Sequence, residues 1–160
     1  MKFIGNINEV ITDEFIETCK KHAKIYKTYG RTPEQILEQT INGEAVEFLV
    51  IKKLGFKAVP FEISEYDAIG KNGEKIEIKH TFKNEKWWTY NPKSYAHFLR
   101  NTHKIDKIIL CYLNKESGDV FLKFETSADV FEKYSKQSNF NSSFYFNTLI
   151  AEKNGDCIIY

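Results

Sequence analysis

The chain has 160 residues, of which 42% are hydrophobic and 28% charged, a composition typical of one folded domain rather than of a disordered chain. The formal net charge of +1 does not by itself indicate a protein that binds polyanions. Three cysteines without a CxxC pair argue against a zinc finger or a redox motif and favour reduced thiols in a cytoplasmic protein. The first residues lack a signal-peptide pattern, and no apolar run approaches the roughly 18 residues of a membrane span, so we expect no membrane association.

The charge is unevenly distributed along the chain. Residues 1–70 carry 9 basic against 11 acidic side chains, residues 71–107 carry 9 against 4, and residues 108–160 carry 5 against 7. The middle segment is therefore basic, with a local charge of +5. Such a segment can attract a polyanion, although a solvated surface explains the same imbalance.

The first third of the chain is predicted to be helical. Apolar residues recur at three- and four-residue intervals over Glu14–Tyr29, and Thr32-Pro33-Glu34 has the pattern of a second helix start. Asn42–Leu54 has a wide apolar face, which predicts a well-buried helix, and Gly55 is placed to end it.

Three short strands are predicted next, over Lys57–Phe61, Tyr66–Gly70 and Glu74–Thr81. Lys71-Asn72-Gly73 joins the last two, and Asn-Gly between strand-forming residues indicates a hairpin. Within the third strand, the two-residue period places Glu77 and Lys79 on one face, with apolar neighbours on the other.

The remaining chain alternates between loops, strands and helices. This order predicts a mixed α/β domain with helices beside a central sheet, organised as an N-terminal helical segment (1–41), a core (42–113) and C-terminal strands and helix (114–160). The individual expectations are a loop over 83–92, a helix over 94–102, a buried strand over 107–113, a turn over 114–118, a strand over 119–125, a helix that Ser127 caps and that runs to 133, and one or two strands over 144–160.

Asp67 and Glu77 lie on the two strands of the predicted hairpin and can approach each other on one sheet face. Two carboxylates held close together repel each other unless a cation neutralises them. Hard oxygen ligands suit Mg²⁺, which keeps several waters and needs few protein ligands, and the carbonyl of Ile78 is a third candidate ligand. The pattern therefore predicts a magnesium site, in which we expect Mn²⁺ to substitute.

Lys79 is two residues from Glu77 and projects into the same space. Its ammonium group can orient an attacking water, act on the proton of that water, or stabilise negative charge in a transition state. The alternative is a solvated hairpin with a cross-strand salt bridge, which would contribute less than about 1 kcal/mol.

Tyr66-Asp67-Ala68-Ile69 followed by Glu77-Ile78-Lys79 resembles the PD-(D/E)XK nuclease superfamily, with Tyr66 in place of the usual proline. The similarity spans Asn42 to Leu113. It implies a restriction-endonuclease-like fold, a central mixed β-sheet flanked by α-helices, and a metal-dependent endonuclease that hydrolyses DNA phosphodiester bonds.

The superfamily also tends to place a glutamate on the helix before the hairpin. Asn42-Gly43-Glu44-Ala45-Val46-Glu47 resembles that helix, and Glu44 is preferred over Glu47 as the additional catalytic and metal-binding carboxylate. Glu47 lies about one turn further on, so either side chain can reach the metal.

Several basic and aromatic residues of the middle segment are candidates for contact with nucleic acid. Each has an alternative role, as a solvated cation or as a cover for the core. They are Lys83, Lys86, Trp87, Trp88, Arg100 and Lys104.

The sequence therefore predicts a Mg²⁺-dependent DNA endonuclease related to phage or restriction enzymes, possessing Asp67, Glu77, Lys79 and Glu44 as site residues. A homodimer is expected if both strands of a duplex are cut. The alternatives are a junction-resolving nuclease, an RNA-directed nuclease, and a nucleic-acid-binding protein without catalytic activity on the same fold.

Overall fold

The computed structural model describes residues 1–26, 30–63, 65–92, 104–139 and 143–160. The helix expected over 94–102 therefore lies outside the described residues. The described helices are α1 (Asp13–Ala23), α2 (Pro33–Leu54), α4 (Ala128–Tyr134), α5 (Thr148–Lys153) and the short 3-10 helix η1 (Ile7–Glu9). The strands are β1 (Lys2–Asn6), β2 (Lys57–Ala58), β3 (Ala68–Ile69), β4 (Lys75–Thr81), β5 (Trp88–Tyr90), β6 (Lys107–Leu113), β7 (Asp119–Ser127), β8 (Ser135–Gln137), β9 (Phe144–Phe146) and β10 (Cys157–Ile159).

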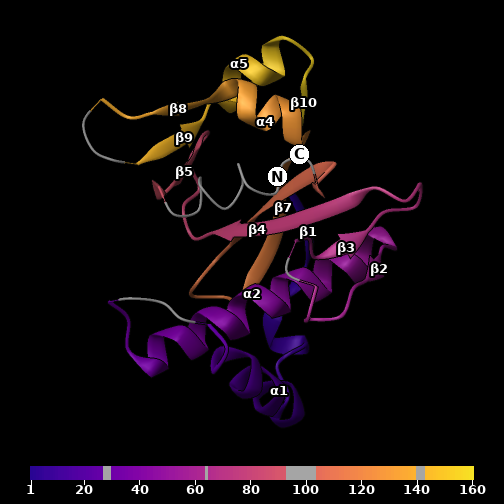
Figure 1. Ribbon diagram of the computed structural model, residues 1–160, viewed down its shortest axis with the longest axis vertical. Coiled ribbons are helices and arrows are strands. Elements are labelled where there is room, and N and C mark those ends of the chain that lie inside the picture. The colour runs from indigo at the N-terminus through magenta and orange to yellow at the C-terminus, as the bar shows by residue number, and fades with distance from the viewer. Residues whose placement is uncertain (27–29, 64, 93–103, 140–142) are drawn as a thin grey trace.

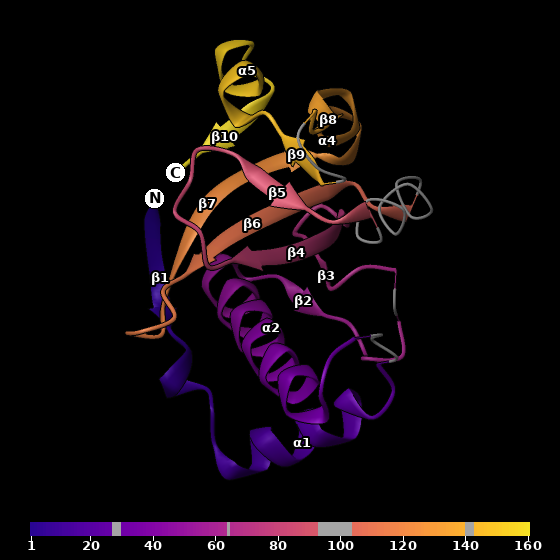
Figure 2. The same ribbon diagram turned by 90° about the vertical axis from the view of Figure 1, so that its left-hand side faces the viewer.

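The main sheet is mixed and curled, and the presence of helices beside a central sheet confirms the predicted mixed α/β domain (Figure 1). Its strand order is β1-β7-β6-β4-β3-β2, and β10 also pairs with β7. The pair β4–β6 is parallel and aligns Glu77 with Ile108, whereas β2–β3, β3–β4 and β6–β7 are antiparallel. Helices α1 and α2 lie on one side of this sheet, and α4, α5 and the small sheet β5-β9-β8 lie on the other (Figure 2).

Helix α2 is one continuous helix of 22 residues, so the expected division at residues 41 and 42 falls inside it. Thr32 and Gln35 form a capping box, Pro33 occupies the first turn, and Gly55 ends the helix with φ of 69°. Asn42-Gly43 does not interrupt the helix, because the stripe of buried residues continues across it from Thr40 to Val50.

Several of the other predicted elements are shorter than expected. Helix α1 ends at Ala23. Strands β2 and β3 pair over only two residues each, because pairing stops at Ala58 and Ala68, where the connecting segment between the strands begins and ends. The segment 83–92 is not entirely a loop, because it contains β5. Strands β4, β6 and β7 and the Ser127 cap of α4 agree with the sequence pattern, whereas β1, β8 and α5 were not predicted.

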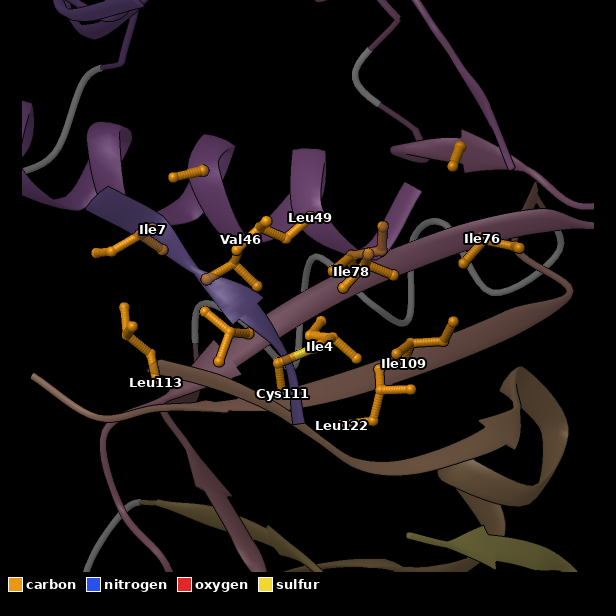
Figure 3. Packing of buried hydrophobic residues seen from close by; sticks show 14 residues of the cluster. Ile4, Ile7, Val46, Leu49, Ile76, Ile78, Ile109, Cys111, Leu113 and Leu122 are labelled. Atoms are coloured by element: carbon orange, nitrogen blue, oxygen red, sulfur yellow. The ribbon is translucent and has the colours of Figure 1, made fainter. Parts of the chain in front are cut away.

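The apolar side chains form one cluster on each side of the main sheet. Ile76 and Ile78, which are 0% and 2% exposed, pack with Val46 and Leu49 of α2 and with Ile109 (Figure 3). This agrees with the alternation in the sequence and fixes β4 rigidly against α2. The second cluster comprises buried residues from β5 through α5: Trp88, Tyr90, Ile105, Ile108, Leu110, Phe124, Ala128, Phe131, Tyr134, Phe146 and Ala151.

Within the described residues, no helix combines the length and the apolar character that a membrane crossing requires.

Candidate active site

Asp67 lies at the point where the β3–β4 ladder ends. Its amide donates to the carbonyl of Ile76 at 2.8 Å, and its Oδ2 accepts the amide of Ile78 at 2.7 Å. Beyond the end of β3, the side chain of Asp67 therefore replaces a backbone carbonyl as the hydrogen-bond acceptor for β4. Two backbone-anchored contacts hold this carboxylate in one position.

Glu77 and Lys79 project from β4 toward Asp67. The Glu77 side chain is only 3% exposed and its Oε1 is in contact with Lys79 Nζ. The same Nζ lies 3.8 Å from Asp67 Oδ2 and donates to the carbonyl of Ile78 at 3.2 Å. One ammonium group is thus shared by three of the four oxygen groups that the sequence nominates as metal ligands.

The Ile78 carbonyl faces the edge of β4 that β3 leaves open. Carbonyl groups of alternate strand residues point the same way, and the carbonyl of Ile76 already pairs with the Asp67 amide. The carbonyl of Ile78 consequently points to the side occupied by the Asp67 carboxylate, where its hydrogen bond from Lys79 forms.

The two candidate glutamates of α2, Glu44 and Glu47, have different neighbours. Glu44 Oε1 lies 2.6 Å from His22 Nδ1, and Glu44 Oε2 accepts the Cys19 thiol at 3.6 Å. Glu47 is the α2 carboxylate that interacts electrostatically with Asp67, Lys79 and Glu77. The preferred Glu44 is thus held by α1, and Glu47 is within electrostatic reach of the hairpin residues, while both line the same cavity.

Burial and mutual repulsion perturb the acidic groups of this cluster. Burial raises the pKa of Glu77 to about 7, with Lys79 opposing the shift and Asp67 adding to it. Burial, followed by repulsion from Asp67, raises the pKa of Glu47 well above its usual range. Burial lowers the pKa of Lys79, but the carboxylates of Glu77 and Asp67 outweigh it and raise that pKa above the ordinary value.

These groups line an open cavity of about 900 Å³ between α1, α2 and the segment that follows β2. Asp67, Glu77 and Lys79 form one end of it, and both Glu44 and Glu47 also reach it. Sequence reasoning did not identify the α1 wall of this cavity, because the helical spacing of α1 gives no indication that its exposed face turns toward the hairpin.

The donor set fits a hard cation. Within the described ranges, no three His, Cys, Asp or Glu side chains are grouped so that they could hold a metal ion by themselves. Mg²⁺ does not need such a cage, because it binds through one or two carboxylates and retains waters. The carboxylates of Asp67 and Glu77 and the carbonyl of Ile78 already surround one positive charge, that of Lys79.

The basic and aromatic candidates for nucleic-acid contact do not share one location. Lys83, Lys86 and Trp87, which is 46% exposed, line a separate cavity of about 470 Å³ beside β9. Lys104 pairs with Glu65 at 3.2 Å, and Arg100 lies outside the described residues.

Trp88 is a correction to the nucleic-acid candidates. It is 6% exposed and belongs to the second apolar cluster, where its ring lies 5.0 Å from that of Tyr90 and 5.6 Å from that of Phe131. A ring so enclosed cannot stack on a base, so Trp88 has the alternative role of covering the core.

No protein-family model matches this chain, and no curated protein matches it in sequence.

Proposed function

We propose that the protein is a magnesium-dependent endonuclease that hydrolyses DNA phosphodiester bonds, with Asp67, Glu77 and Lys79 at its active centre. The proposal assigns the helix carboxylate to Glu47 rather than Glu44. The resemblance of the hairpin to the PD-(D/E)XK superfamily supports it, as does the order of a helix, a hairpin and a parallel strand in the fold.

The observation that carries the proposal is the convergence of oxygen groups on Lys79 Nζ. An exposed salt bridge between Glu77 and Lys79 would need no second carboxylate and would leave Glu77 in water. Instead Glu77 is 2% exposed, and Asp67 and the carbonyl of Ile78 approach the same ammonium group. A buried carboxylate with a raised pKa beside a second carboxylate and a lysine, lining a cavity, supports a functional site.

The chain's own groups have separable roles. Asp67 is fixed by the amide of Ile78, and Glu77 is held by burial, so the two carboxylates are oriented before any substrate arrives. Magnesium bound by these oxygens would polarise a phosphodiester oxygen and make a bound water more acidic. Glu47 of α2 lines the same cavity and adds a further carboxylate.

The ammonium group of Lys79 is suited to act as a hydrogen-bond donor in this chemistry. Its pKa lies above the ordinary value because of Glu77 and Asp67, so its Nζ holds a proton at neutral pH. A protonated amine orients the attacking water or stabilises charge on the phosphate, and it does not remove the proton of the water. Without a bound metal, Lys79 is therefore protonated and suited to the two roles that require a hydrogen-bond donor.

The proposal is tested by incubating the purified protein with supercoiled plasmid and with a four-way junction, in Mg²⁺ or in EDTA. Asp67→Asn and Lys79→Ala should each abolish Mg²⁺-dependent cutting. Preference for plasmid or junction separates a general endonuclease from a junction-resolving enzyme, and a labelled RNA strand tests the RNA-directed alternative.

Two matched control variants lie at the other end of β4. Asp106 Oδ2 accepts the amide of Lys75 at 2.8 Å, so Asp106→Asn changes a carboxylate with the same kind of backbone contact as Asp67. Lys75→Ala removes an exposed lysine from the same strand as Lys79. Both controls should cut DNA normally. Intact protein that binds DNA without cutting it would replace the nuclease proposal with the non-catalytic alternative.

A homodimer remains part of the proposal only for the cutting of both strands, because two active sites must then act on one duplex. The oligomeric state is measured by sedimentation of the protein alone and of the protein with uncut duplex in EDTA. A monomer that only nicks plasmid would remove the dimer and leave the nuclease proposal intact.

A further inference from the structure

The cavity that contains Asp67, Glu77 and Lys79 is also lined by exposed apolar side chains, which form its apolar wall. Ile25, Tyr26, Phe48 and Ile63 are 66%, 46%, 49% and 36% exposed, and all four line this cavity. Isolated exposed apolar residues are ordinary, but several gathered around one hollow mark a binding surface. They come from the segment directly after α1, from α2 and from the segment after β2, so the wall is assembled by the tertiary fold.

Aromatic rings on this wall are held in fixed orientations. Phe61 stacks on His22 with ring centroids 3.8 Å apart and planes 2° apart. Tyr26 meets Phe61 edge-on at 5.7 Å and 90°, and Glu44 holds His22 from below at 2.6 Å. Flat rings that are already stacked and hydrogen-bonded lose little entropy when another ring packs on the wall.

The charge around the cavity argues against a duplex lying in it. Among the described residues, its lining includes five carboxylates and two lysines, which are Lys21 and Lys79. Duplex binding is dominated by contacts of basic side chains with many phosphates, and a lining with this charge offers few of them. A ligand that places one phosphate at the charged end and an uncharged ring against the aromatic wall avoids the mismatch.

We propose that this cavity holds an unpaired nucleobase beside the scissile phosphate, so that the substrate class is single-stranded DNA or an unpaired stretch within a branched DNA. The inference rests on the proposed nuclease function for the identity of the phosphate site. The cavity volume of about 900 Å³ lies within the range of roughly 300–1,000 Å³ usual for ligand pockets, and both ends belong to one continuous hollow.

Phe48 provides the sharpest test. It is half exposed on α2, so Phe48→Ala removes a ring from the wall at a position where alanine favours the helix. Phe48→Trp restores a ring. Phe3 is a matched control, because it is 53% exposed, lies on β1 and is not part of the lining of this cavity.

The binding experiment uses full-length protein in EDTA and fluorescence anisotropy of a labelled oligo-thymidylate, with a blunt duplex and an oligo-uridylate as competitors. Single-stranded DNA should bind at least about tenfold more tightly than duplex, and Phe48→Ala should lose about tenfold of that affinity, as expected when one stacking contact is removed. Phe3→Ala and Phe48→Trp should bind like the original protein. Equal binding by Phe48→Ala and Phe3→Ala, tighter binding of duplex, or preference for oligo-uridylate would each overturn the inference.

Cleavage in Mg²⁺ keeps the two proposals distinguishable. Cutting of a forked DNA at its unpaired arm, reduced in Phe48→Ala and abolished in Asp67→Asn, supports both. Equal cutting of duplex and single strand, insensitive to Phe48→Ala, overturns the substrate class and leaves the nuclease standing. If single-stranded DNA binds in a Phe48-dependent manner but no DNA is cut, the nuclease proposal fails and the nucleobase cavity stands.

Discussion

Replacing Glu77 by glutamine should stabilise the protein against unfolding near pH 8 when no divalent cation is present. The carboxylate is 3% exposed, and burial raises its pKa from the ordinary 4.5 to about 7 despite the opposing effect of Lys79. One pKa unit corresponds to about 1.4 kcal/mol, so ionised Glu77 costs the folded state about 3 kcal/mol. Glutamine has almost the same shape and carries no charge, so this cost disappears.

The sign of the pH dependence follows from the direction of the shift. Because the pKa of Glu77 is higher in the folded protein, the folded state binds more protons between about pH 4.5 and 7. The contribution of Glu77 to stability is therefore lost as the pH rises through this window. At about pH 4, where the carboxyl is protonated in both states, Glu77→Gln should have little effect, whereas near pH 8 it should raise the Tm by roughly 5–10 °C.

Urea denaturation at several pH values, in EDTA and in Mg²⁺, measures this effect directly. Mg²⁺ at about ten times its Kd should stabilise the original protein by about 1.4 kcal/mol and should stabilise Glu77→Gln much less. The reasoning is refuted if Glu77→Gln destabilises the protein more near pH 8 than near pH 4. It is also refuted if Mg²⁺ stabilises both proteins equally.

Three further predictions concern the neighbouring residues. Lys79→Ala should lower the rate of DNA cleavage by about 100-fold or more while leaving the far-UV circular dichroism unchanged, because it removes a preorganised donor; unaltered turnover would exclude Lys79 from the chemistry. Glu47→Gln should weaken Mg²⁺ binding in a calorimetric titration more than Glu44→Gln does, and the reverse order would restore Glu44 as the helix carboxylate. Burial lowers the pKa of His80 from 6.5 to about 4, so its neutral form contributes about 3 kcal/mol that is present above pH 6.5 and lost as the pH falls toward 4. In His80→Gln the acid-induced loss of stability over that window should shrink, and an unchanged urea midpoint profile would contradict the assignment.

The parts of the fold that the sequence predicted well are those set by local pattern. Alternation along β4 correctly separates buried Ile76 and Ile78 from the Glu77 and Lys79 face, and Gly55 ends α2 as a left-handed cap. Ser127 caps α4 through its side chain, as its spacing indicates. These features depend on a few adjacent residues, so they can be inferred without knowledge of the tertiary structure.

The features that sequence reasoning missed depend on contacts between distant segments of the chain. Strand β1 has little strand character of its own and forms by pairing with β7 more than a hundred residues later. Glu44 and Glu47 are equivalent in a helical pattern, and only the position of His22 on α1 distinguishes them. Trp88 in a polar segment resembles an exposed ring, yet β5 carries it into the second apolar cluster.

The choice between Glu44 and Glu47 also bears on why α1 is present at all. His22 and Cys19 of α1 bind Glu44 at 2.6 Å and 3.6 Å, so α1 occupies one α2 carboxylate and leaves Glu47 facing the hairpin. A fourth carboxylate beside Asp67, Glu77 and Glu47 would add repulsion that one divalent cation neutralises only in part. His22→Ala should therefore remove one of the two α1 partners of Glu44 and, at the same time, the ring that stacks on Phe61 at the cavity wall. Loss of single-strand affinity with unchanged Mg²⁺ affinity would assign α1 to the substrate wall, whereas altered Mg²⁺ affinity would show that Glu44 competes for the metal.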